Sequence, residues 1–222
     1  MITVIVSTSP RPSHPATRVL DRTIVSVKAQ LPNVPIIITC DGIPSDAPHD
    51  THIRYGGFKE AIQGRYDNTR VIPFEQHQHQ SGMLGIALAM VDTPVLLYLE
   101  DDWEFLSYPP IEWEKLCTLI TGGWTNYIRL FPQHRIHPLH EHMMKARVIF
   151  GDVPLVLHNQ WSQNPHLAST EFYRKEVLPR CQTRTDYIEN IMHGIGMDGL
   201  ATYNPREGVS MMVCQHIDGD QE

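Results

Sequence analysis

Three consecutive acidic residues, Glu100, Asp101 and Asp102, directly follow an apolar run at residues 95–99. The run predicts a buried strand, and unpaired charge at the tip of a buried strand is unfavourable unless something positive lies beside it. Ligands of α/β proteins bind beyond the carboxyl ends of strands. Oxygen atoms suit Mg²⁺ or Mn²⁺, which usually share their coordination shell with substrate phosphates. The cluster therefore predicts a site for a divalent cation and a phosphorylated substrate; the alternative is a solvated acidic turn.

The elements that must position this cluster alternate along the first hundred residues. Periodicity predicts strands at 2–6, 36–40, 71–74 and 95–99, and helices at 17–31, 57–65 and 81–91, the last capped by Ser81. Strands and helices that alternate with short connections predict a mostly parallel sheet flanked by helices. No G-x-G-x-x-G follows the first strand and no G-x-x-x-x-G-K-[ST] occurs, which argues against a Rossmann dinucleotide site and a P-loop.

The second half of the chain is less regular. We expect helices at 111–120, 171–178 and 186–193, strands at 127–131, 153–157 and 211–214, and a polar loop at 159–166. His216 follows the last of these strands.

Composition limits the class of protein. With 222 residues, of which 41% are hydrophobic, the chain predicts one domain with a real core. A net charge of −7 argues against a broadly basic nucleic-acid surface. No apolar run approaches the ~20 residues that cross a bilayer, and the four scattered cysteines predict reduced thiols. We therefore expect a cytoplasmic protein, in the host cytoplasm if its source is viral.

Four features in order carry a resemblance to a known family. They are Ser7-Thr8-Ser9-Pro10 after the first strand, Cys40-Asp41-Gly42 after the second, the strand that ends in Glu100-Asp101-Asp102, and the late His216. This set resembles the GT-A glycosyltransferases, which use nucleotide-sugar donors. The resemblance implies a single GT-A-like domain, with residues 1–105 as the nucleotide-sugar-binding half. Residues 106–222 would form a smaller, irregular acceptor-side half that ends in a metal-ligand strand.

The resemblance also implies roles for these residues. Asp102 and His216 would bind Mn²⁺ or Mg²⁺, which bridges the two phosphates of a donor, with a UDP-sugar favoured. The implied donor contacts are Thr8, Ser9, Asp41, Glu100 and Asp101. A glutamate at the first position departs from the strict D-x-D motif and leaves the division between metal and ribose open. Asp41 is equally explained as a turn-forming Asp-Gly, and His216 as a surface histidine.

A transfer to an acceptor hydroxyl benefits from a carboxylate that takes the proton. By resemblance to enzymes with an acid near the start of a late helix, we favour Glu189 as this base, with Asp186 second. Both are also explained as ordinary solvated helix acids. Because base candidates exist and no nucleophile stands out, we expect an inverting displacement.

The acceptor side is predicted from a polar, partly cationic stretch. His134, His137, His140 and His142 lie near Arg129, and the loop that follows contains Trp161 and His166. No zinc spacing is present, so we expect a surface that faces an anionic acceptor, or a plain surface loop. Trp103, Trp161 and Tyr173 are candidates for stacking on a sugar or base, with buried packing as the alternative.

The same stretch and the compact size resemble small phage-type transferases that glycosylate hydroxymethylated bases in DNA. The acceptor itself remains unknown, with modified DNA as one candidate. Two other functions stay open. One is a nucleotidyltransferase that acts on a sugar phosphate, although no glycine-rich loop follows the first strand. The other is a non-catalytic module that binds nucleotide sugars.

Overall fold

The computed structural model of the protein describes residues 2–130, 144–181, 187–193, 195, 197, 199–205 and 211–217. Its strands are β1 Ile2–Thr8, β2 Ile36–Cys40, β3 Thr69–Pro73, β4 Val95–Glu100, β5 Trp103–Phe105, β6 Tyr127–Arg129, β7 Met144–Phe150, β8 Val153–His158, β9 His166–Ser169, β10 Leu200–Tyr203 and β11 Cys214–His216. Its α-helices are α1 Arg18–Gln30, α2 His49–Ile62, α3 His79–Leu88, α4 Trp113–Thr121, α5 Thr170–Phe172 and α6 Ile188–His193. A π-helical segment, Tyr173–Val177, and a 3₁₀ turn, Leu178–Arg180, continue α5.

Nine strands form one sheet in the order β3-β2-β1-β4-β9-β6-β10-β8-β7. Strands β1 to β4 are parallel, as predicted, whereas β9 runs antiparallel to both of its neighbours and the sheet as a whole is mixed. A separate two-stranded sheet pairs β5 with β11. The predicted α/β class, a central sheet flanked by helices, is confirmed.

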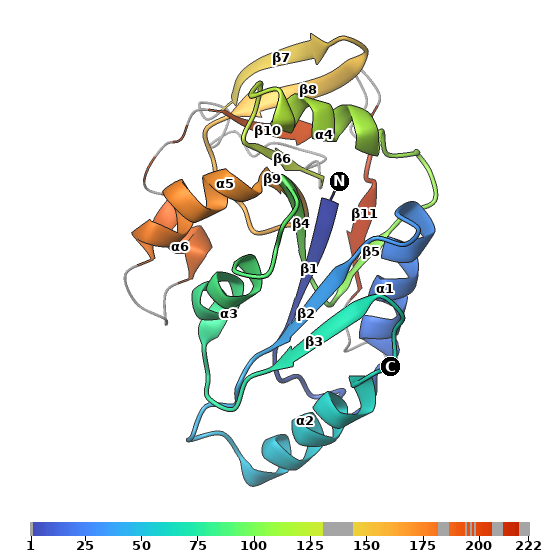
Figure 1. Ribbon diagram of the computed structural model, residues 1–222, viewed down its shortest axis with the longest axis vertical. Helices are drawn as coiled ribbons and strands as arrows, with labels where there is room; N and C mark the ends of the chain where they lie inside the picture. The colour runs from blue at the N-terminus through green and yellow to red at the C-terminus, as the bar shows by residue number, and fades with distance from the viewer. Residues whose placement is uncertain are drawn as a thin grey trace.

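Alternating side chains of the central strands enter two cores. Val4 and Leu97 pack with α1, α2 and α4 on one face, and Ile5 and Leu96 pack with α3 and the α5 segment on the other. Figure 1 shows α3, α5 and α6 gathered on one side of the sheet and α1 on the other. Because both faces are covered, the central strands are continuous apolar runs rather than alternating ones.

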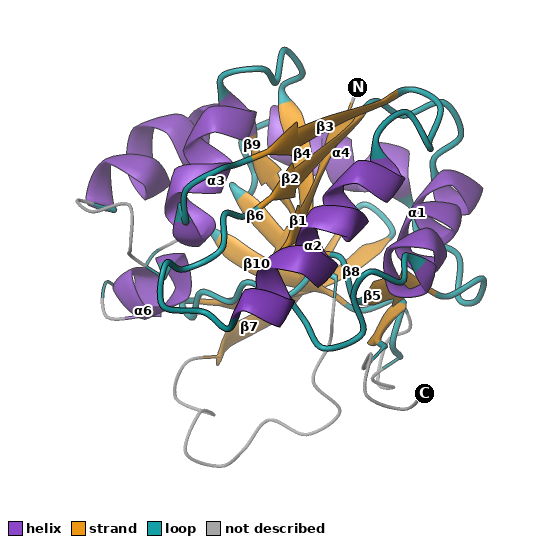
Figure 2. Cartoon of the chain, turned by 90° about the horizontal axis from the view of Figure 1, so that it is seen from below, coloured by secondary structure: helices purple, strands orange, loops and turns teal. Residues whose placement is uncertain are grey.

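Helix α2 lies beyond the carboxyl ends of the first strands, below them in Figure 1 and in front of them in Figure 2. Within the described part of the chain, no helix is both long enough and apolar enough to cross a membrane.

Several expected elements need correction. Helix α2 begins at His49 rather than at residue 57, because Tyr55, Phe58 and Ile62 supply a buried helical face that Gly56-Gly57 obscures in the sequence. Helix α3 begins at His79, so Ser81 is a buried residue inside the helix and not its cap.

A polar loop was expected at residues 159–166. Its last residue, His166, is instead the first residue of β9. This strand is inserted between β4 and β6. Strands β5, β7 and β10 were not predicted, because they are short or lack a clear apolar run.

Candidate functional site

The ends of β1, β2 and β4 meet at one edge of the sheet. Thr8 is in register with Cys40, and Ser7 is in register with Glu100. The backbone N–H of Asp41 donates to the carbonyl of Thr8 at 3.0 Å, and that of Asp101 donates to the carbonyl of Ser7 at 3.0 Å. The predicted donor-side residues from three separate segments therefore lie along one edge. We call residues 100–102 the acidic turn.

The acidic turn is largely buried and carries more negative charge than its surroundings neutralise. Asp101 is 2% exposed, and burial raises its pKa to about 6 although the guanidinium of Arg11 opposes the shift. Burial, followed by repulsion from Asp102 and Asp101, raises the pKa of Glu100 to about 7. Raised pKa values of this kind mark a place where bound positive charge would be stabilising.

Arg11 is a residue of this site that the sequence did not point to strongly. Its Nη2 lies 2.5 Å from Oδ1 of Asp101 and 3.3 Å from Oδ2 of Asp102. In the sequence, Arg11 is visible only as a basic residue in the loop after the first strand. The turn is also tied to α1, because Thr23 Oγ1 donates to the carbonyl of Asp101 at 2.6 Å.

His216 reaches the acidic turn from the far end of the chain. The antiparallel pair β5–β11 sets His216 opposite Trp103, and the backbone N–H of Ile217 donates to the carbonyl of Asp102 at 2.7 Å. His216 Nε2 then lies 3.1 Å from Oδ2 of Asp102. Its ring packs edge-on against the ring of Trp103, with centroids 5.2 Å apart. Trp103 is buried, so its role is packing and not stacking on a ligand.

The pair formed by Asp102 and His216 fits a divalent cation. Oδ1 of Asp102 is buried and has no hydrogen-bond partner among the residues that the structure describes, which is costly unless another group occupies that direction. The described residues contain no cluster of three or more His, Cys, Asp or Glu side chains arranged around a common point. Mg²⁺ in nucleotide sites is nevertheless held by one or two protein ligands together with substrate phosphates. The donor set therefore suits a cation that arrives with its substrate.

Asp41 is engaged with the backbone of its own neighbourhood. Its Oδ1 accepts the N–H groups of Gly42 and Gln78, each at 2.7 Å. Its Oδ2 lies 2.9 Å from Nδ1 of His77, and Asp41 is 2% exposed. The turn-forming explanation of Asp41-Gly42 thus describes its contacts. His77, whose side chain is 29% exposed, is a neighbour of Asp41 that no sequence pattern indicates.

Of the other donor-side residues, Thr8 is buried and Ser9 is exposed. The carbonyl of Thr8 accepts a hydrogen bond from the hydroxyl of Tyr55 at 3.1 Å.

Two predicted acceptor-side residues lie inside the protein. Trp161 and His166 have no exposed surface, and Tyr173 is buried with them. His166 Nε2 lies 2.6 Å from the hydroxyl of Tyr173, and its Nδ1 lies 2.7 Å from the carbonyl of Asn164. Their burial in the second core contradicts the expected acceptor surface and the expected stacking on a sugar.

Arg129 is half-buried, and its Nε donates to Oγ1 of Thr202 at 3.1 Å. Glu189 is 41% exposed on α6, and its carboxylate lies 3.9 Å from His193 in the same helix. Figures 1 and 2 both show α6 and β5 on opposite sides of the molecule. Asp186 and the four histidines His134, His137, His140 and His142 lie outside the described residues.

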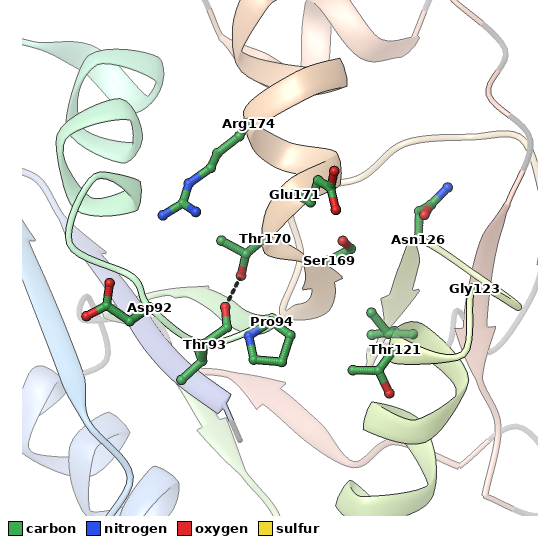
Figure 3. Close-up of a pocket in the computed structure, with 11 residues that line it drawn as sticks. Asp92, Thr93, Pro94, Thr121, Gly123, Asn126, Ser169, Thr170, Glu171 and Arg174 are labelled. Atoms are coloured by element: carbon green, nitrogen blue, oxygen red, sulfur yellow. Dashed lines mark hydrogen bonds between the residues drawn. The ribbon is translucent and has the colours of Figure 1, made fainter.

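A separate polar cavity of about 500 Å³ opens before the amino end of β4, so the length of that strand separates it from the acidic turn. Figure 3 shows Arg174, Thr170 and Asp92 around it. The Arg174 guanidinium donates to the carbonyl of Leu88, the last residue of α3, and to that of Val91 in the segment that follows. Glu171, a further acid that the sequence offers as a base after Glu189 and Asp186, lines this cavity, whereas none of the described donor-side residues does.

Known proteins share this fold at low sequence identity. No protein-family model matches the chain, and no curated protein matches its sequence. Among solved structures, GalNAc-T7 with UDP, GalNAc and Mn²⁺ has a TM-score of 0.63 and 14% identity over 98% of this chain and 44% of its own. Staphylococcus aureus TarS 1-349 in complex with UDP-GlcNAc has a TM-score of 0.56 and 11% identity over 100% of this chain and 59% of its own.

The chain thus spans about half the length of these structures. At such identities the likeness concerns architecture alone, and it identifies the fold as GT-A-like, in agreement with the resemblance found in the sequence.

Proposed function

We propose that this protein is a metal-dependent glycosyltransferase that moves a sugar from a nucleoside diphosphate donor to an acceptor hydroxyl. The observation that carries the proposal is the buried acidic turn at the carboxyl end of β4, with His216 3.1 Å from Asp102. On this fold, GalNAc-T7 binds UDP and Mn²⁺ and TarS binds UDP-GlcNAc. A uridine diphosphate sugar is therefore the favoured donor.

Asp102 and His216 would hold the divalent cation, and the unpartnered Oδ1 of Asp102 supports this assignment. A bound cation supplies electrostatic stabilisation of the charge that develops on the leaving diphosphate. Thr8, Ser9 and the acidic turn form the donor edge in this proposal. The side chain of Asp41 is already used by backbone N–H groups, so its contribution is to fix the loops beside the nucleobase.

The proposal also assigns a catalytic base and acceptor-binding residues to the second half of the chain. We infer an inverting displacement with Glu189 or Asp186 as the base, because these acids precede or begin α6. The Glu189 side chain is 41% exposed, so its carboxylate is accessible to an acceptor hydroxyl, as a proton acceptor requires. Arg129 and His134 remain predicted acceptor-side groups, with a hydroxymethylated base in DNA among the acceptors to be tested. We also propose that residues 1–222 form one domain with a donor half and an acceptor half.

Metal-coupled nucleotide binding tests the proposal. The full chain is titrated with UDP, GDP, UTP and UDP-sugars, with and without Mn²⁺, and followed by thermal unfolding and calorimetry. A ligand at 100 times its Kd adds about 2.7 kcal/mol of stability. We expect Asp102→Asn to abolish the Mn²⁺-dependent response to UDP. Asp152→Asn is the control, because Asp152 is exposed and pairs only with Lys115 among the described residues.

A response to triphosphates alone would support a nucleotidyltransferase. A Mn²⁺-dependent response without any donor hydrolysis would support a binding module. No response to any nucleotide would refute the proposed function.

A further inference from the structure

The loop after β1 is held rigidly by helix α2. Arg54 Nη1 donates to the carbonyl of Pro12 at 2.9 Å, and the Tyr55 hydroxyl donates to the carbonyl of Thr8 at 3.1 Å. His14 is 3% exposed, and its ring stacks on that of Phe58 with centroids 4.1 Å apart. The loop therefore has a fixed path toward the acidic turn.

His14 fixes the backbone of Arg11 within this loop. Its Nδ1 accepts the N–H of Arg11 at 3.1 Å, and its own N–H donates to the carbonyl of Arg11 at 3.2 Å. Burial, followed by the charges of Arg11 and Arg54, lowers the pKa of His14 to about 4. A neutral imidazole keeps Nδ1 available as an acceptor, so the Arg11 backbone is held at both of its polar groups.

The Arg11 side chain contacts the carboxylates that the proposed metal would use. A single nitrogen, Nη2, makes the contacts with both Asp101 and Asp102. The Asp101 contact is the shorter, at 2.5 Å against 3.3 Å. The side chain of Arg11 is 20% exposed, whereas that of Asp101 is 2% exposed. The guanidinium thus contacts the buried carboxylates and is itself partly exposed to solvent.

A divalent cation and a guanidinium on the same carboxylate repel each other. A guanidinium also carries several N–H donors in a planar fork, a geometry that matches phosphate oxygens. A cation at Asp102 would therefore weaken the longer of the two Arg11 contacts and leave the shorter one to Asp101. The guanidinium would then lie beside the phosphates that the cation binds.

We propose that Arg11 binds the diphosphate of the donor and exchanges its contact with Asp102 for this contact when a divalent cation occupies Asp102. The inference rests on the proposed function and adds a named positioning residue to it. It makes Arg11 a competitor of the free metal and a partner of the metal–diphosphate complex. These two roles predict changes of opposite sign in a single variant.

The experiment measures Mn²⁺ and nucleotide binding to the full chain by calorimetry. In Arg11→Gln we expect Mn²⁺ alone to bind about tenfold tighter, because the competing charge is gone. In saturating Mn²⁺ we expect UDP to bind at least ~10-fold more weakly, because a charged hydrogen bond is lost. The affinity for uridine should stay unchanged, since it has no phosphate.

Two further variants keep the test falsifiable. Arg11→Lys retains the charge without the fork, so we expect Mn²⁺ affinity near that of the wild type and an intermediate loss of UDP affinity. Arg65→Gln removes an exposed arginine that pairs with Asp21 and should change neither affinity.

Parallel weakening of Mn²⁺ and UDP in Arg11→Gln, or no change in either, would overturn the inference while the proposed function stands. Absence of Mn²⁺-dependent UDP binding in the wild type would overturn both.

Discussion

His158 offers a direct test of how burial controls charge in this fold. It ends β8, is 6% exposed, and lies with its Nε2 2.9 Å from Oγ1 of Thr202. Burial, followed by the positive charge of Arg129, lowers its pKa from 6.5 to about 4. Between these two values the unfolded chain binds a proton that the folded chain does not, so stability falls as the pH falls.

The size of the effect follows from that difference. Acidification from about pH 7.5 to about pH 5 should remove about 2 kcal/mol of stability through His158 alone. In His158→Gln this share of the acid-induced loss should disappear, although the variant is less stable at neutral pH. The other titrating groups are present in both proteins and cancel in the comparison.

Urea unfolding followed by tryptophan fluorescence gives the free energy of unfolding at each pH by linear extrapolation. His49→Gln is the matched control, because His49 is exposed at the start of α2 and its replacement should leave the acid-induced loss as in the wild type. An equal loss of stability on acidification in His158→Gln and the wild type would refute the reasoning.

Two predictions concern packing. Gly42→Ala would place a Cβ 2.0 Å from the backbone carbonyl carbon of Gln76, so we expect it to lower the free energy of unfolding by more than ~2 kcal/mol. Gly56 lies in helix α2, and a Cβ there would meet nothing within 4 Å, so Gly56→Ala should raise the free energy of unfolding by ~0.5–1 kcal/mol. Thermal unfolding of the pair checks the opposite signs, and a neutral Gly42→Ala contradicts the close approach. Leu97→Ala removes a fully buried side chain of the central strand and should cost ~2–5 kcal/mol in urea unfolding; a cost below ~1 kcal/mol would contradict the assigned core.

The first half of the fold was predictable because its signals are strong and local. Strand β2 has the predicted bounds, and α1 differs from its prediction by one residue at each end. The apolar run before Glu100 predicted a buried strand. The prediction succeeded because both faces of β4 are covered, which makes the whole strand apolar. Local periodicity was sufficient wherever an element buries a regular face.

The second half was not predictable for an equally physical reason. Strand β9 contains His166, whose polar atoms are satisfied by Tyr173 and Asn164. No local pattern shows that a histidine will find such partners inside a core. The same limit applies to Trp161, which looked available for a ligand and is buried.

The candidate site was predicted in part. The sequence identified the acidic turn and His216, which the structure brings within 3.1 Å. It did not identify the contacts of Arg11 or His77, because both depend on loops whose paths are set by helices α2 and α3. Charge partners across loops are a tertiary property, whereas strand ends are visible in the sequence.

The pairing of β5 with β11 has a consequence for how the protein forms during synthesis. Asp102 leaves the ribosome about half a chain length before His216. Until β11 pairs with β5, the acidic turn lacks the contact with His216, so the candidate site is completed only by a contact between distant parts of the polypeptide. Such a late, long-range contact leaves the candidate site incomplete until most of the fold is in place.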